Sequence, residues 1–130
     1  MKRISAIIVL LFVLFFVGIY LGYAQVAPSS NPVLTRTVDV NKDGKADITY
    51  YNDGKNVAKI EADTNYDGKP DTTVHLKDGK FESAEVDTNN DGKIEKKYYD
   101  APSFSEWLNK NHPEFHDDMY FSNGIFVARY

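Results

Sequence analysis

Asp39-Val40-Asn41-Lys42-Asp43-Gly44-Lys45-Ala46-Asp47 is the first of three related stretches that decide the fold of this 130-residue chain. Residues 63–71 (DTNYDGKPD) and 87–95 (DTNNDGKIE) repeat it, and all three follow the pattern D-x-N-x-D-G-K-x-[DE]. The first Asp of the pattern recurs every 24 residues. A fixed period of this length indicates one supersecondary unit that is copied and stacked.

Each stretch has the ligand chemistry of a loop that binds a hard cation. Oxygen-bearing side chains occupy positions 1, 3, 5 and 9, and Gly occupies position 6. In calcium loops position 7 contributes a backbone carbonyl, and Gly permits the sharp turn. Asp, Asn and Gly are also common turn residues, but a plain turn does not need acids at positions 1, 5 and 9 together. The predicted Ca²⁺ ligands are Asp39, Asn41, Asp43, Lys45 (carbonyl) and Asp47 in loop one, Asp63, Asn65, Asp67, Lys69 (carbonyl) and Asp71 in loop two, and Asp87, Asn89, Asp91, Lys93 (carbonyl) and Glu95 in loop three.

The stretches differ from an EF-hand in two ways. An EF-hand has a bidentate Glu at position 12 and flanking helices, whereas position 12 here is Tyr50, Val74 or Tyr98. The flanking residues are β-branched and aromatic, which is typical of strands. Residues 39–99 therefore resemble the D-x-[DN]-x-D-G calcium loops set between β-strands in integrin-type FG-GAP and related bacterial β-repeat families. They are also similar to the D-V-N-x-D-G-K of dockerins, without the position-12 acid and the helices. The resemblance implies calcium binding and leaves the partner open.

The repeat predicts a mainly β fold, an antiparallel meander of hairpins joined by calcium loops. Asp53-Gly54 and Asp78-Gly79 lie between alternating segments and indicate tight hairpin turns. The plain turns should then lie at one end of the sheet and the calcium loops at the other. The expected strands are residues 33–38, 47–51, 57–62, 72–76, 81–86 and 94–99.

Alternation along these strands predicts which face is buried. Charged Lys59, Glu61, Glu85 and Lys97 have the opposite parity and should face solvent. The apolar face is thin for a small domain, so bound ions are expected to supply part of the stability. The expected buried residues are Ile48, Tyr50, Ile60, Ala62, Val74, Leu76, Ala84, Val86, Ile94 and Tyr98.

The C-terminal residues leave the repeat and predict a cap, a short helix followed by a hairpin. Ser103 and Glu106 match a capping box, with Ser103 as the N-cap. Phe104, Trp107 and Leu108 then form one apolar stripe, which we expect to cover the sheet; the alternative is a Trp face exposed for a ligand. Residues 119–130 form a hairpin around Asn123-Gly124 that is apolar on both faces, so it is expected to be buried or offered to a partner.

The N-terminus reads as a targeting segment. Lys2 and Arg3 precede the almost wholly apolar residues 4–23, and Gly22-Tyr23-Ala24 fits a cleavage site. An uncleaved anchor is the alternative, since about 20 apolar residues can also span a bilayer. Both alternatives place residues 25–130 outside the membrane, in the periplasm, secreted or anchored. The predicted organisation is residues 1–24 as signal peptide or anchor, 25–32 as linker, 33–100 as the calcium-loop repeat domain and 101–130 as the cap.

Composition limits the function further. The chain has no Cys, so neither disulfides nor thiol chemistry are available, and its net charge of −4 argues against binding nucleic acid. We expect a non-enzymatic, exported calcium-binding module with a structural or adhesive role, whose partner is a cell-surface or envelope protein or a polysaccharide. The alternative is a small periplasmic or membrane-anchored metal-dependent enzyme, because His112 and His116 have a spacing that can share a metal on a helix.

Overall fold

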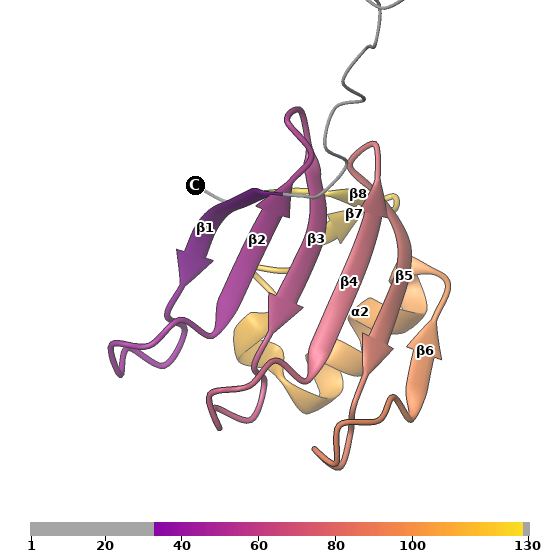
Figure 1. Cartoon of the computed structure of the whole chain (residues 1–130). Coiled ribbons are helices and arrows are strands. Elements are labelled where there is room, and N and C mark those ends of the chain that lie inside the picture. Colours follow the sequence, from indigo (N-terminus) through magenta and orange to yellow (C-terminus); the bar gives the residue numbers. More distant parts are fainter. Residues whose placement is uncertain (1–32, 129–130) are drawn as a thin grey trace, which may run out of the picture. The chain divides into compact units, whose positions relative to one another are not determined.

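The computed structural model describes residues 33–128, which form an antiparallel sheet with one helical layer against it (Figure 1). The sheet has 8 strands in the order β1-β2-β3-β4-β5-β8-β7, and β6 also pairs with β5. The fold is therefore mainly β, an antiparallel hairpin meander with a short C-terminal helix and a terminal hairpin, as predicted. The elements are β1 (Val33–Val38), β2 (Ile48–Asn52), β3 (Val57–Ala62), β4 (Thr72–Lys77), β5 (Lys80–Val86), β6 (Lys96–Tyr98), α2 (Ala101–Asn111), η1 (Pro113–Phe115), β7 (Phe121–Ser122) and β8 (Ile125–Phe126).

The register of the strands builds one apolar face. Tyr50 lies opposite Ile60, Ile60 opposite Val74, and Val74 opposite Ala84, so the alternating residues of four strands line up across the sheet. Every expected inner residue from β2 to β5 is buried, which confirms the predicted face. The opposite face carries ion pairs, Lys59 Nζ to Glu61 Oε1 at 2.8 Å and Lys97 Nζ to Glu85 Oε1 at 2.6 Å.

Ile94 does not follow the predicted pattern. Its side chain is 44% exposed, because β6 begins only at Lys96, two residues later than expected. Tyr98, which does lie in β6, packs against the core. Residues 94 and 95, which alternation assigned to this strand, belong instead to the loop before β6.

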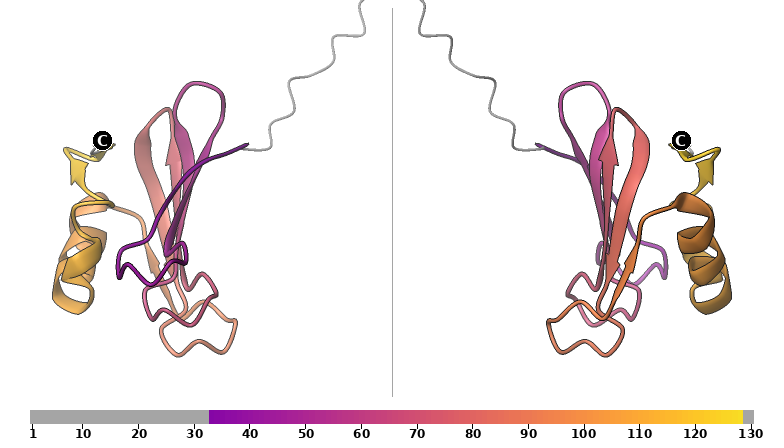
Figure 2. Two further views of the ribbon diagram at one scale, coloured as in Figure 1. Left: turned by 90° about the vertical axis from the view of Figure 1, so that its left-hand side faces the viewer. Right: turned by 90° about the vertical axis from the view of Figure 1, so that its right-hand side faces the viewer.

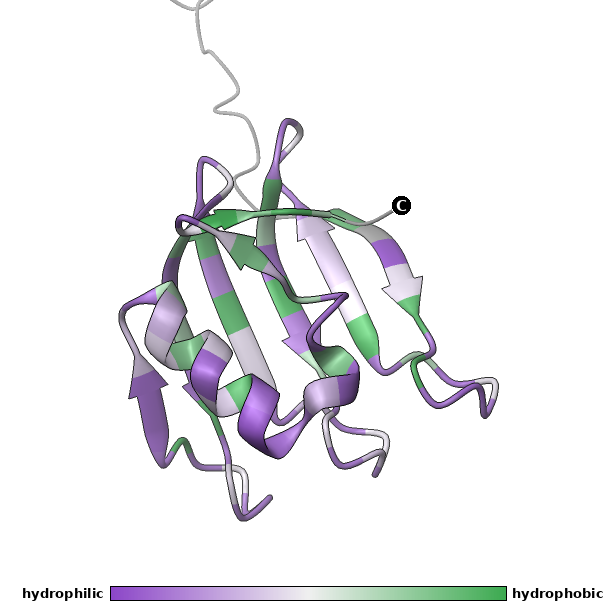
Figure 3. Cartoon of the chain, turned by 180° about the vertical axis from the view of Figure 1, so that it is seen from behind, coloured by the Kyte–Doolittle hydropathy of each residue, from purple (hydrophilic) through white to green (hydrophobic). Residues whose placement is uncertain are grey.

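A helical layer covers the apolar face (Figures 2 and 3). Ala101, Phe104 and Leu108 of α2 are buried, together with Phe115 of η1 and Met119. Phe104 and Leu108 of the predicted stripe therefore cover the sheet, as expected, whereas Trp107 is only half-buried. Of the terminal hairpin, Phe121 is buried and pairs with Phe126, whereas Ile125 is 50% exposed and Val127 37% exposed. The hairpin is thus buried on one side only.

The helix begins three residues earlier than predicted. Its N-cap is Asp100, whose Oδ1 accepts a hydrogen bond from the backbone N–H of Ser103 at 2.8 Å. That bond holds the pKa of Asp100 below its ordinary value. Ser103 lies inside the first turn, so the predicted capping box is wrong. Asp is as good an N-cap as Ser, and Pro102 is tolerated in a first turn because its missing N–H would have no partner there.

The N-terminal predictions concern residues that the structure does not describe. The targeting segment (residues 1–24) and the linker (residues 25–32) both lie outside residues 33–128. Within the described residues, no helix combines the length and the apolar character needed to cross a bilayer.

Candidate metal centre

The three repeated loops lie together at one end of the sheet (Figure 1). Loop one joins β1 to β2, loop two joins β3 to β4, and loop three joins β5 to β6. The two Asp-Gly hairpin turns lie at the opposite end, as the alternation of turn types predicted. Stacking of the repeat therefore places three acidic loops side by side.

The backbone of the three loops has the same conformation. Position 4 is left-handed in each loop, with φ of 61° at Lys42, 62° at Tyr66 and 58° at Asn90. Position 6 is also left-handed, with φ between 87° and 91° at the three glycines. A Cβ on any of these glycines would meet nothing within 4 Å, so the backbone angle and not the available space requires Gly there.

The Asp at position 1 closes each loop on itself. In loop three, Asp87 Oδ2 accepts a hydrogen bond from Gly92 N at 2.7 Å, and Oδ1 accepts one from Asp91 N at 3.3 Å. Asp39 and Asp63 accept the equivalent bonds in the other loops. Desolvation alone would raise the pKa of Asp87, but backbone N–H groups of loop three together hold this pKa below its ordinary value. The loop thus favours the charged form that a cation needs.

The side chains at positions 3 and 5 are ordered in the same way. In loop one, Asn41 Oδ1 accepts from Asp43 N at 2.9 Å, and Asp43 Oδ1 accepts from Lys45 N at 2.8 Å. Loops two and three repeat both bonds. Each loop is therefore built largely by hydrogen bonds from its backbone to its own oxygen-bearing side chains. Loop two also contacts the helical layer, since the Tyr66 ring lies 5.7 Å from that of Phe115.

Position 9 distinguishes the loops. Asp47 and Asp71 are buried, 4% and 7% exposed, and each accepts the N–H of position 2 at 2.8 Å. The hydroxyls of Thr64 and Thr72 also donate to Asp71, at 2.8 Å and 2.7 Å from its Oδ1. Burial raises the pKa of Asp71 against the lowering effect of these donors. Glu95 makes the same bond to Thr88 N at 2.7 Å, yet its side chain is exposed.

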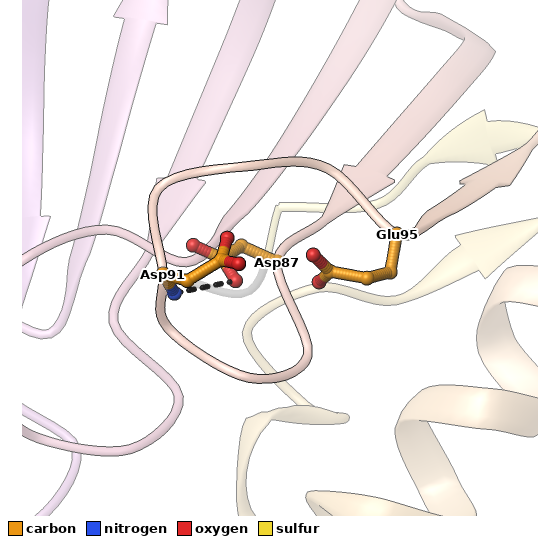
Figure 4. Close-up of side chains that lie close together, drawn as sticks. All are labelled: Asp87, Asp91 and Glu95. Atoms are coloured by element: carbon orange, nitrogen blue, oxygen red, sulfur yellow. Dashed lines mark hydrogen bonds between the residues drawn. The ribbon is translucent and has the colours of Figure 1, made fainter.

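Loop three is the place where the acids converge (Figure 4). Asp87, Asp91 and Glu95 each present a carboxylate oxygen within 4.8 Å of the others, and no other group of three His or acidic side chains in residues 33–128 does so. Figure 4 shows the Glu95 carboxylate pointing across the loop towards Asp87 and Asp91. The additional methylene of Glu accounts for this, because Glu95 can hold the Thr88 N–H while its carboxylate stays at the mouth of the loop.

The residues at position 12 cannot complete an EF-hand ligand set. Tyr50 and Val74 are buried in the sheet, 5% and 0% exposed, and Tyr98 packs against the core. The Tyr50 hydroxyl donates to the carbonyl of Asp118 at 2.6 Å, so it is directed away from loop one. Each loop thus offers the ligands of positions 1 to 9 only, as the sequence indicated.

His112 and His116 do not lie on one helix. Helix α2 ends at Asn111, His112 is its C-cap, and η1 separates the two histidines. The nearest acids are different ones, Glu114 at 3.9 Å from His112 Nδ1 and Asp117 at 3.4 Å from His116 Nδ1. The His112 ring lies against Trp107 and the His116 ring against Tyr120, with ring centroids 5.5 Å and 5.3 Å apart.

The sequence reading missed two features of this end of the sheet. It assigned Asp47 and Asp71 to the ion and did not foresee that they bind backbone N–H groups beneath their loops. It also missed the threonines that partner Asp71. A signal was present, since Thr follows the first Asp in loops two and three and Thr72 follows Asp71.

No family model, curated protein or solved structure matches this chain. The chemistry of the loops and of their surroundings is therefore the basis for assigning a function.

Proposed function

We propose that this protein is an exported calcium-binding β-repeat module with a structural or adhesive role. The observation that carries the proposal is the approach of Asp87, Asp91 and Glu95 to within 4.8 Å of one another. Two oxygens that each lie about 2.3–2.6 Å from one Ca²⁺ are at most about 5 Å apart. The spacing of the three carboxylates thus suits a single calcium ion.

The remaining donors of loop three also suit this ion. The Asn89 side chain and the Lys93 carbonyl occupy the positions that supply neutral oxygens in calcium loops. Three carboxylates that are close together repel one another unless a cation is present. The same backbone conformation in loops one and two supports weaker sites there, because the position-9 Asp is buried in both, whereas Glu95 is exposed.

The positions of the loops support a structural role. Each loop connects two neighbouring strands at the same end of the sheet, so an ion that orders a loop also fixes the strands that it joins. Without the position-12 Glu, affinities near those of extracellular modules are expected, about 10⁻⁴ to 10⁻³ M. Sites of that strength fill where calcium is plentiful, which is outside the cytosol.

Export is supported by Lys2 and Arg3, the apolar residues 4–23 and Gly22-Tyr23-Ala24. We expect the native protein to be recovered from the cell envelope or the medium. Mass spectrometry of its N-terminus then separates the two forms: a chain that starts at Gln25 has a cleaved signal peptide, and one that starts at Met1 is anchored. Recovery from the cytosol would contradict export.

Calorimetric titration of the protein with CaCl₂ is expected to show binding at three sites, with loop three the tightest because its carboxylates are already assembled. Asp91→Asn should weaken the tightest site about ten-fold or more, because affinity in such loops depends on the number of charged ligands. Magnesium should produce little heat, since it requires a tight octahedron and retains its water.

Asp78→Asn is the matched control for this titration. It removes one carboxylate from the β4–β5 turn, at a φ of 52° that Asn also tolerates. The affinities of this variant should equal those of the wild type. A wild-type titration without heat, or an Asp91→Asn protein that binds as tightly as the control, would refute the assignment.

A further inference from the structure

A pocket of about 220 Å³ lies between loops two and three and the C-terminal end of α2. Asp71 and Asn65 of loop two, Asn90 of loop three, and Trp107 and Asn111 of α2 all contribute to its walls. Sites for drug-sized ligands typically measure about 300–1,000 Å³. This pocket is smaller and suits a single small ring.

Trp107 is held rigidly at this pocket. Its indole stacks on Phe104, with centroids 5.9 Å apart and an angle of 28° between the ring planes. The ring centroids of Tyr98 and His112 lie 5.9 Å and 5.5 Å from that of Trp107. Trp107 is nevertheless only half-buried, although it is the single Trp of the chain. A large aromatic ring that is fixed by its neighbours and still accessible binds a ligand with little loss of side-chain entropy.

A second hollow borders the same indole. It measures about 290 Å³ and shares Lys96, Trp107 and Asn111 with the first pocket. Its other walls come from Ser103, Glu106 and Lys110 of α2. Two adjoining hollows that share one aromatic ring suit a ligand made of consecutive small units.

The polar walls select among ligand classes. Hydroxyl, amide and carboxylate groups surround the Trp, so donors and acceptors are mixed. The three carboxylates of loop three carry one more negative charge than a bound Ca²⁺ would neutralise, and Asp71 balances Lys96, so the walls offer no excess positive charge for an acidic ligand. A single indole does not form the aromatic cage that quaternary ammonium groups require. A pyranose ring fits both the indole and the mixed polar walls, since it has an apolar C–H face for the indole and hydroxyls that donate and accept hydrogen bonds.

We propose that this pocket binds an uncharged hexose unit of a polysaccharide, with the next unit of the glycan in the second hollow. The inference extends the proposed function by naming the chemical class of its partner. It rests on that function at one point: Asp87 is both a wall of the pocket and a proposed calcium ligand of loop three. Calcium that orders loop three therefore completes the pocket.

The test uses the fluorescence of the only Trp, in the full chain purified in a zwitterionic detergent without a sugar headgroup. Cellohexaose and hexa-N-acetylchitohexaose are the uncharged probes, and oligogalacturonate is the acidic one. We expect a saturable change with at least one uncharged probe and none with the acidic probe. No response to either uncharged probe, or a response to the acidic probe alone, would overturn the proposal.

Variants locate the site by calorimetry with the probe that binds. Trp107→Ala and Asn111→Ala should each weaken binding about ten-fold, and Trp107→Phe should weaken it less. Asn111 is exposed, so its replacement tests the pocket even where Trp107→Ala disturbs the core. Tyr99→Ala is the matched control, because Tyr99 is 75% exposed and lines neither hollow. Equal losses in Tyr99→Ala and Asn111→Ala would place binding elsewhere and refute the site.

Calcium separates this inference from the proposed function. Asp91 belongs to loop three but does not line the pocket, so Asp91→Asn should lose the calcium dependence of glycan binding while the pocket walls stay intact. Asn111→Ala should keep the full heat of calcium binding. Calcium heat without glycan binding would overturn only the saccharide site, and glycan binding without calcium heat would overturn only the calcium assignment.

Discussion

Removing calcium is expected to lower the melting temperature of the protein substantially. A site filled at ten times its dissociation constant adds about 1.4 kcal/mol to the free energy of unfolding, so three independent sites add about 4 kcal/mol. In a domain of this size 1 kcal/mol corresponds to about 4–8 °C. Loop three alone should thus account for about 5–10 °C, and all three loops for about 15–30 °C. Thermal unfolding followed by circular dichroism, in calcium and in a chelator, measures the difference.

Two variants of loop two separate the contribution of the ion from that of the loop itself. Asp67 is exposed, and Asp67→Asn keeps an oxygen that can accept the Lys69 N–H, so this variant should behave like the wild type in chelator and lose part of the calcium stabilisation. Asp71 accepts hydrogen bonds from Thr64 and Thr72 while buried, so Asp71→Ala leaves donors without an acceptor. It should cost about 1–3 kcal/mol even in chelator. If the melting temperature of the wild type is the same in calcium and in chelator, the three loops are plain turns and the calcium assignment is wrong.

Phe104→Ala is expected to lower the free energy of unfolding by about 3–5 kcal/mol, a range typical for removing a buried Phe. Phe104 is 0% exposed and contacts rings from three other elements, with centroids 5.8 Å from Phe81, 5.8 Å from Tyr98 and 6.4 Å from Phe121. Its loss would open a cavity where the helical layer meets the sheet. Since small domains are commonly stable by only about 5–15 kcal/mol, the variant should be only marginally folded without calcium.

Urea unfolding at fixed calcium concentration tests this expectation. Tyr99→Ala is again the control, because a substitution at an exposed position usually changes stability by less than about 0.5 kcal/mol. Equal midpoints for the two variants would show that α2 is not an integral part of the core. Added calcium should stabilise Phe104→Ala as much as the wild type, because the rings that Phe104 contacts belong to strands and to α2 and not to the loops.

The strands and their buried face were predictable from the sequence because both depend on local rules. β1 and β3 have the predicted bounds, and the alternation from Ile48 to Val86 correctly identified the inner face. Side chains of a strand alternate between the two faces regardless of what covers them. The positions of the Asp-Gly turns and of the three loops also followed, since the 24-residue period sets them.

The sequence by itself thus determined the repeat, the meander and the oxygen-rich composition of the three loops. Tertiary structure decided how the acids are used. All three position-9 acids accept a backbone N–H, but Asp47 and Asp71 are buried, while the longer and exposed Glu95 also points across loop three towards Asp87 and Asp91. It also placed Trp107 beside loops two and three, which are distant in sequence. Such outcomes depend on side-chain length, burial and contacts between remote segments, and a local pattern contains none of these.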